Sequence, residues 1–281
     1  SYVSKAMISK DFLPSEPLRE YIHRYRLRHF VFHNGLVPTI KPFPPRPEQC
    51  LTFYVRGAET CRYLHDGVEI KKPRSVISGQ FTYRVDRYVS YPEILMIIVD
   101  FRPGVLHRLT GIPFTEFTNK DLDAETVFSP EIRRVNDRLS DTWSYAEMIH
   151  IVESYFTELV QQSKKELLAV DKLLTLVTQD PDHSVDWLAR NACLSPRQLE
   201  RKFDERIGVS PKTFLRISRF NQSYWLHITN PKLNWYQIAM TCGYTDYQHL
   251  VKEYQEFAHA NPIIFFAEES KAPGRILGLT K

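Results

Sequence analysis

The sequence has few cysteines, no long apolar run and little net charge, and each of these absences excludes a class of protein. Only 4 of the 281 residues are cysteine, and no two of them are spaced as CxxC. We therefore expect neither a disulfide scaffold nor a metal site. There is no apolar leader segment and no run of about 18 apolar residues, so we expect a cytoplasmic protein without a membrane partner.

Catalytic motifs are also absent from the sequence. It contains no GxSxG, no HExxH and no phosphate-binding loop, so we expect no catalytic residue, no cofactor and no enzymatic activity. The net charge is only +4, and the part from Lys164 onward holds 16 basic and 13 acidic residues. A nucleic-acid partner would therefore be recognised through the arrangement of the charges and not through their sum.

The length and the apolar content predict two folded domains. A chain of 281 residues suits two domains of ordinary size, and its 43% of hydrophobic residues can supply their cores. The most polar short stretch lies at residues 161–165. We therefore predict one domain at residues 1–163 and a second at residues 164–281.

Short β-branched and aromatic runs, separated by turn residues, fill residues 50–101. They predict an antiparallel barrel or sandwich, and Asp66-Gly67 predicts a tight hairpin within it. The proline-rich segment 37–49 predicts an irregular surface loop. Aromatic residues on these strands are candidates for a ligand site, although such residues more often belong to the core. The candidates are Tyr54, Tyr63, Phe81, Tyr83 and Phe101.

From about Pro130 to Val177 the apolar residues recur with a helical period. An apolar stripe on such helices covers the sheet or pairs two protomers, and the two alternatives look alike in a sequence.

The strongest pattern is a motif written twice, at residues 184–211 and 234–262. In each copy a polar capping residue opens a short helix with an apolar–alanine pair, and a tight turn follows. A second capping residue, Ser195 or Thr245, then opens a second helix that ends near a proline. Two copies with nearly the same offset predict two helix-turn-helix motifs.

This stretch resembles the DNA-binding region of AraC-type (AraC/XylS) transcription regulators. The resemblance is carried by FDERIGVSP at residues 203–211, by Arg219 and by IAMTCGYTD at residues 238–246. The FRPG segment at residues 101–104 is similar to the one that follows the last strand of the sensor domain in one subgroup of these regulators. The resemblance implies a cupin-like N-terminal barrel and linking helices that often pair two protomers.

We therefore predict an α+β fold: an N-terminal antiparallel, cupin-like β-barrel with linking helices, and a C-terminal all-α domain with two helix-turn-helix motifs. The predicted function is that of a bacterial, sequence-specific transcription regulator that responds to a small ligand or a partner. The alternative is a small-molecule or protein sensor whose DNA-binding half is degenerate. The expected partners are double-stranded DNA read in its major groove, a small-molecule effector, a second copy in a homodimer, and RNA polymerase.

The outer faces of the two second helices supply the candidate DNA-binding residues. Arginine can form two parallel hydrogen bonds with guanine, and glutamine can do the same with adenine. Glu200 accepts from a cytosine amine or orients Arg201, and His249 is either a DNA contact or a packed, capping residue. The candidates are Arg197, Gln198, Glu200, Arg201, Tyr247, Gln248, His249 and Lys252.

A single helix is predicted between the two copies, over residues 211–227. Within it Arg219 is expected to form a salt bridge between the two subdomains, with a phosphate contact as the alternative. His259 stands in the second copy where Gly208 stands in the first. The residue at this place is expected to end its helix in the left-handed conformation, which histidine tolerates less well than glycine.

Overall fold

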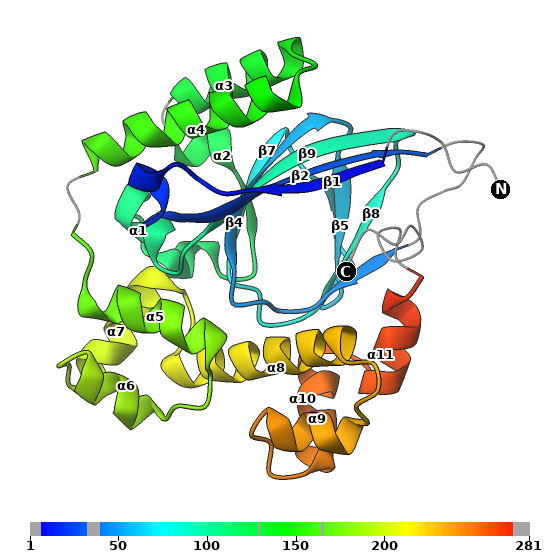
Figure 1. Ribbon diagram of the computed structural model, residues 1–281, viewed down its shortest axis with the longest axis vertical. Helices are drawn as coiled ribbons and strands as arrows, with labels where there is room; N and C mark the ends of the chain where they lie inside the picture. The colour runs from blue at the N-terminus through cyan, green and yellow to red at the C-terminus, as the bar shows by residue number, and fades with distance from the viewer. Residues whose placement is uncertain (1–6, 33–39, 129, 164–165, 272–281) are drawn as a thin grey trace.

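In the computed structural model, which describes residues 7–32, 40–128, 130–163 and 166–271, two antiparallel sheets lie above a group of helices (Figure 1). The larger sheet has the strand order β1-β2-β9-β4-β7-β10, and the smaller sheet has the order β3-β8-β5-β6. The strands are Met7–Phe12 (β1), Ile22–Val31 (β2), Lys41–Phe43 (β3), Gln49–Arg56 (β4), Glu59–Tyr63 (β5), Glu69–Lys71 (β6), Ser75–Ser78 (β7), Val85–Val89 (β8), Glu93–Phe101 (β9) and Asp121–Asp123 (β10).

The larger sheet buries both of its faces. Because successive side chains point to opposite faces of a strand, each strand contributes to two cores. One face packs on the smaller sheet through a cluster that includes Tyr54 and Val89. The predicted antiparallel sheets are confirmed, but no strand pairing among the described residues joins the two sheets, so they form a sandwich that is not closed into a barrel.

The other face of the larger sheet is covered by helices, which lie along the top of the molecule in Figure 1. The N-terminal helices are Glu16–Leu18 (η1), Val105–Thr110 (α1), Phe114–Phe117 (η2), Ala124–Val127 (α2), Glu131–Asp141 (α3) and Tyr145–Gln162 (α4). Ile132 of α3 and Phe156 of α4 are fully buried against this sheet. The apolar stripes of α3 and α4 therefore cover the sheet, which is one of the two alternatives left open by the sequence.

The C-terminal part is helical throughout its described residues, as predicted. Its helices are Ala169–Gln179 (α5), Val185–Asn191 (α6), Pro196–Arg206 (α7), Pro211–Thr229 (α8), Trp235–Thr241 (α9), Tyr247–Ala258 (α10) and Pro262–Glu269 (α11). The long α8 runs beneath the sheets and joins the two groups of shorter helices (Figure 1). A search of the described residues finds no helix with the length and apolar character needed to cross a membrane.

One local prediction is wrong in the sheet region, and another is confirmed. The proline-rich segment holds a strand, β3, in which Pro42 pairs with Asp86 of β8. A proline fits there because β3 is the edge strand of the smaller sheet, where a missing N–H costs no ladder hydrogen bond. Residues 37–39 of this segment lie outside the described residues. The predicted hairpin at Asp66-Gly67 is present, with Gly67 at a φ of 72° between β5 and β6.

Asp121 is a buried carboxylate that links the two sheets. It accepts hydrogen bonds from Ser78 Oγ at 2.6 Å and Tyr63 OH at 2.9 Å, and Lys72 Nζ lies 3.2 Å away. Burial by itself raises the pKa of Asp121, but the Lys72 and Arg87 cations and these hydrogen bonds outweigh it and hold the pKa at about 2.

We expect Asp121→Asn to weaken the fold by about 2 kcal/mol at pH 7, and by progressively less as the pH falls. The folded pKa is lower than the unfolded one, so the ionised carboxylate stabilises the fold above the unfolded pKa. That stabilisation is lost as the pH falls through the folded pKa of about 2. Urea unfolding at pH 7, 4 and 3 measures the effect, with Asp141→Asn at an exposed position as the control. A difference between wild type and variant that is constant over this range would contradict the assignment.

Candidate nucleic-acid interface

The first helix-turn-helix motif is formed by α6 and α7, and its local signals are those predicted. Ser184 accepts a hydrogen bond from the Trp187 N–H and opens α6. Ser195 accepts from the Gln198 N–H and opens α7, and Pro196 occupies the first helical position. Leu199 and Phe203 of α7 are buried in the motif's own core. Capping and packing therefore fix the start of α7 and leave its opposite side outermost.

The second motif, formed by α9 and α10, repeats this plan with one difference. Asn234 caps α9 as predicted, but α10 is capped by Asp246, whose Oδ1 accepts from the His249 N–H at 2.7 Å. The prediction of Thr245 as the cap is wrong by one residue. Both turns place a left-handed residue at the same point, Cys193 (φ 54°) and Gly243 (φ 72°). The extra residue of the second turn therefore lies after this point.

Four candidate residues gather on the exposed N-terminal half of α7. The side chains of Arg197, Gln198, Glu200 and Arg201 all lie on the surface, and that of Arg201 is 67% exposed. Three of them, with Ser195, line a surface hollow of about 350 Å³. The Oε1 atom of Gln198 accepts from the Ser195 N–H at 2.8 Å, so a bidentate contact of Gln198 with adenine would compete with its capping role. Neither arginine has a capping role, although Arg201 Nε lies 3.8 Å from Glu205 Oε1 at the surface.

The candidates on α10 divide into two exposed and two half-buried side chains. Gln248 and Lys252 are exposed, whereas Tyr247 and His249 are half-buried. The His249 ring meets Tyr244 edge-on, with 5.2 Å between the ring centroids. The His249 ring thus makes a packing contact within the motif, and its contact with DNA stays a prediction.

The salt bridge predicted for Arg219 is made by Arg216 instead. Arg216 Nε lies 2.8 Å from Glu253 Oε1, and Arg216 Nη1 lies 3.0 Å from Glu256 Oε1, so α8 is tied to α10. Among the described residues Arg219 forms no ion pair, and its guanidinium lies 5.7 Å from the centroid of the Tyr244 ring. The two arginines are nearly one helical turn apart, and only Arg216 lies within reach of both glutamates.

The ends of the two second helices adopt the predicted left-handed conformation. Gly208 follows α7 at a φ of 81°, and His259 ends α10 at a φ of 55°. His259 therefore keeps the backbone geometry that glycine would have there, so the departure from the motif has not altered the local fold.

The C-terminal half of α7 is closed off by the sheet domain. Arg206 Nε lies 2.6 Å from Asp171 Oδ1 of α5, and both side chains are buried. Gln49 Nε2 donates to the Arg206 carbonyl at 2.6 Å, and Thr118 Oγ1 donates to the Gly208 carbonyl at 2.7 Å. The last two hydrogen bonds come from β4 and from the segment after η2. They join the sheet domain to the C-terminal end of α7, the helix that carries Arg197 and Arg201.

A second set of contacts joins the sheet domain to the second helix-turn-helix motif and its neighbouring helices. Arg84, just before β8, donates to the Ala258 carbonyl at the end of α10, 3.2 Å away, and lies 2.6 Å from Glu268 of α11. The Arg46 guanidinium lies 5.4 Å from the centroid of the Tyr224 ring on α8. The sheet domain thus contacts the C-terminal end of α7 and also α8, α11 and the end of α10.

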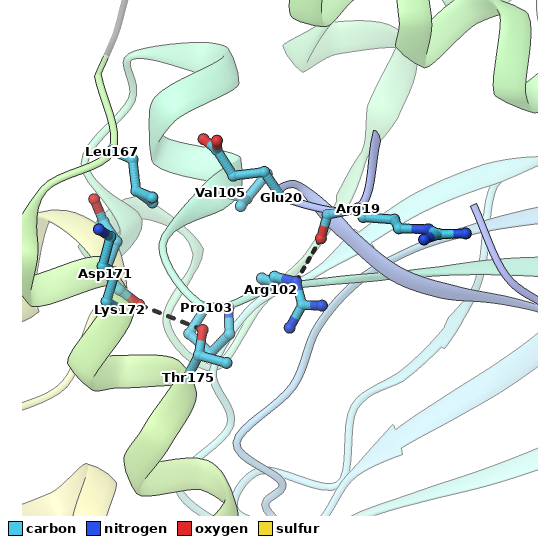
Figure 2. A pocket seen from close by; sticks show the side chains of 9 residues that line it. All are labelled: Arg19, Glu20, Arg102, Pro103, Val105, Leu167, Asp171, Lys172 and Thr175. Atoms are coloured by element: carbon cyan, nitrogen blue, oxygen red, sulfur yellow. Dashed lines mark hydrogen bonds between the residues drawn. The ribbon is translucent and has the colours of Figure 1, made fainter. Parts of the chain in front are cut away.

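We call the contact between the sheet domain and the C-terminal helices the junction. A pocket of about 410 Å³ lies there, between α5 and the segments around η1 and α1 (Figure 2). Within it Arg102 Nε donates to the Arg19 carbonyl at 2.7 Å. A smaller pocket of about 180 Å³ shares Arg102, Pro103 and Thr175 with it. These pockets could not be predicted from the sequence, because their walls come from segments far apart in the chain.

Of the five candidate ligand residues, Tyr54 lies on β4 and Tyr63 on β5, whereas Phe81 and Tyr83 lie in the segment between β7 and β8 and not on a strand as predicted. Tyr63, Phe81 and Tyr83 belong to one cluster. Tyr54 belongs to another, and its hydroxyl donates to Glu59 at 2.7 Å. Phe101 packs instead on the helix-covered face, 5.3 Å from the Phe156 ring between centroids. The structure therefore brings Tyr63, Phe81 and Tyr83 together and places Tyr54 and Phe101 in two other clusters.

Comparisons with known proteins match both halves of the chain. Residues 188–267 match a family described as a helix-turn-helix domain, and residues 10–123 match a domain of unknown function (DUF6597). No curated protein sequence matches the chain.

Similar solved structures include ToxT from Vibrio cholerae, with 12% identity over 89% of this chain and 98% of that chain and a TM-score of 0.49. A second ToxT structure, bound to an unsaturated fatty acid, has 11% identity over 89% of this chain and 96% of that chain, with a TM-score of 0.48. Protein NMB1881 from Neisseria meningitidis has 9% identity over 35% of this chain and 88% of that chain, with a TM-score of 0.25.

Proposed function

The chain carries an AraC-type helix-turn-helix domain at residues 188–267, and from this premise we propose that it is a sequence-specific DNA-binding transcription regulator that responds to a small ligand or a partner. The observation that carries the proposal is the exposed N-terminal half of α7. Its two arginines stand on a capped helix whose other side is buried, which is the arrangement that places side chains on base edges in the major groove.

The proposed DNA contacts are unequal between the two motifs. Arg197 and Arg201 read bases, while Gln198 and Glu200 lie beside them on the same exposed turn. On α10 the exposed Gln248 and Lys252 are proposed as base or phosphate contacts, and Tyr247 and His249 support them by packing. The first motif is thus the main reader, and the ion pairs between α8 and α10 hold the second motif rigidly beside it.

We place the boundary between the sensing and DNA-binding domains at residues 163 and 164. Helix α4 ends at Gln162 and α5 begins at Ala169, which supports a boundary between them. Residues 1–163 are proposed as a cupin-like sensor, supported by its two facing antiparallel sheets. The proposal includes a homodimer, RNA polymerase as a further partner, and no catalytic step.

The junction contacts suggest how a ligand signal would reach DNA. Any change at the sensor that moves Gln49, Thr118 or Arg84 acts directly on the ends of α7 and α10. We infer that the sensor adjusts the position or mobility of the recognition helices through these bonds. Selection of binding sites from random DNA tests the function as a whole. Failure to enrich any sequence would favour the alternative of a sensor with a degenerate DNA-binding half.

We expect Arg201→Ala to lower discrimination at one base pair of the selected site by about 1–3 kcal/mol, because a guanidinium fork to guanine is lost. Mobility-shift titrations against the selected site and its single-base variants measure this loss. Arg134→Ala, which removes the same charge from the exposed surface of α3, is the matched control and should leave discrimination unchanged. Equal affinity of the Arg201→Ala and wild-type proteins for every site variant would refute the base-reading role.

A further inference from the structure

The larger pocket at the junction has one wall from the sheet domain and one from the C-terminal helices. Arg102 and Pro103 belong to the segment between β9 and α1, whereas Asp171, Lys172 and Thr175 belong to α5. Figure 2 shows α5 on one side of the pocket and Arg102 on the other. A molecule bound there would therefore contact both domains at once.

The acidic side chains of this wall are already neutralised by cations from outside the pocket. Asp171 Oδ1 lies 2.6 Å from Arg206 Nε, and Glu20 Oε1 lies 2.6 Å from Arg108 Nη2. Neither of these two arginines lines the pocket. The carboxylates of the wall are therefore engaged elsewhere and do not pair with the cations that line it.

Two cations of the wall lack a partner of this kind. Among the described residues neither Arg102 nor Lys172 forms an ion pair. Arg102 Nε donates to the Arg19 carbonyl at 2.7 Å, which holds the side chain in place and leaves both terminal guanidinium nitrogens without a hydrogen bond to the described part of the chain. The Arg19 side chain itself points away from the pocket (Figure 2). Two uncompensated cations, one from each domain, repel each other, and an anion between them would remove that repulsion.

The smaller pocket of about 180 Å³, which adjoins the larger one at Arg102, has a different character. Glu48 and Asp100 line it, and Asp100 also accepts from Arg24 Nε at 2.9 Å. Thr178 of α5 and Asn221 of α8 add neutral polar groups. The two carboxylates would repel a second anionic group, but together with the amide and the hydroxyl they can form hydrogen bonds with the hydroxyl groups of a ligand.

We propose that the junction binds a small phosphate ester with a hydroxylated body, whose phosphate lies between Arg102 and Lys172 and whose hydroxyl groups occupy the smaller pocket. The guanidinium fork pairs with two phosphate oxygens, and the ammonium group supplies a point charge. The bound ester ties α5 to the segment before α1 and so holds the two domains together. The inference rests on the proposed function only in naming this ester as the effector, whereas the site rests on the geometry and charge of the pockets.

The test is isothermal titration of the full-length protein with a matched set of three compounds. Glycerol phosphate carries both parts of the proposed ligand, propyl phosphate lacks the hydroxyl groups, and glycerol lacks the phosphate. We expect glycerol phosphate to bind the wild type with a Kd of about 1 mM or tighter. Propyl phosphate should bind several-fold more weakly, and glycerol should show no binding.

Substitutions on the two sides of the pocket test the phosphate contacts. Arg102→Met and Lys172→Met should each weaken the binding of glycerol phosphate by about tenfold or more, because a charge-assisted contact is lost. Lys172 is exposed, so its variant decides the matter if Arg102→Met fails to fold. Asn221→Leu should remove the preference for glycerol phosphate over propyl phosphate. Lys212→Met, at an exposed position of α8, is the matched control and should bind like the wild type.

Each of four results would overturn the proposal. Glycerol phosphate could fail to bind, or propyl phosphate could bind as tightly. Lys172→Met and a folded Arg102→Met could bind glycerol phosphate like the wild type. Alternatively, Arg197→Met could abolish the binding while Lys172→Met leaves it intact, which would place the phosphate in the hollow on α7. Selection of DNA sites is measured separately, so a protein that selects DNA but binds no glycerol phosphate refutes this inference and leaves the regulator function standing.

Discussion

Replacing Asp171 with alanine is expected to destabilise the protein by about 3–5 kcal/mol, because it leaves the buried guanidinium of Arg206 without its main partner. Both side chains are almost completely buried, and Arg206 Nε lies 2.6 Å from Asp171 Oδ1. Glu205 remains 3.2 Å from Arg206 Nη1, but it is more exposed and reaches a different nitrogen. Asp171 also accepts from the Leu168 N–H at the start of α5, so the helix loses a cap as well. Chemical unfolding at pH 7 measures the loss.

A double-mutant cycle separates the free energy of the ion pair from that of the packing of its two side chains. Arg206→Met removes the charge but keeps a long side chain, so we expect Asp171→Ala combined with Arg206→Met to be clearly more stable than the sum of the single losses. Lys172→Ala, on the exposed side of α5, is the control and should change stability little. A loss below about 1 kcal/mol for Asp171→Ala, or strictly additive variants, would show that this pair does not hold the junction.

The helices of the C-terminal half could be predicted from the sequence, because the residues that mark the start and end of a helix lie close to one another in the chain. A cap, the residues three and four positions later, and a helix end lie within a few residues of one another, as Ser195 and Gly208 illustrate. The cap of α10 shows the limit of such predictions, because it was expected at Thr245 and lies at Asp246. Thr245 and Asp246 are both good capping residues, and only the length of the preceding turn decides between them.

The sheet half was predicted in kind but not in detail. Strand β10 is too short and too acidic to show a strand pattern, and it exists because Leu122 pairs with Ile77 of β7. The salt bridge of Arg216 was missed for a related reason. Helical periodicity predicts which side of α8 is buried, but not which of two arginines on adjacent turns meets an acid on another helix.

The junction could not be predicted at all. Gln49 and Arg206 are separated by 157 residues, and Thr118 and Gly208 by 90. Nothing in either segment alone indicates that they meet. The same holds for the larger pocket at the junction, whose walls come from α5 as well as from the segments around η1 and α1. Sites assembled from several elements depend on tertiary packing, which a single sequence does not display.

Gly208→Ala is the second change with a large expected effect, because this glycine is needed for both its backbone conformation and its lack of a side chain. At a φ of 81° an alanine is strained by about 1–2 kcal/mol. Its Cβ would also lie 2.7 Å from the Phe114 carbonyl oxygen and still closer to Thr118 Oγ1. Thr118 can rotate away only by giving up its hydrogen bond to the Gly208 carbonyl, and the Phe114 backbone can move only if the junction opens.

Gly67→Ala provides the matched control for this experiment. Gly67 has a similar φ of 72°, but an added Cβ there meets nothing within 4 Å. The loss of stability in Gly67→Ala therefore measures the backbone strain alone. Any further loss in Gly208→Ala measures the steric clash at the junction. We expect that excess to be about 1–3 kcal/mol in chemical unfolding, as for overpacking of a well-filled core. Equal losses in the two variants would mean that the sheet domain and the end of α7 are not held as closely in solution as the bonds of Gln49 and Thr118 require.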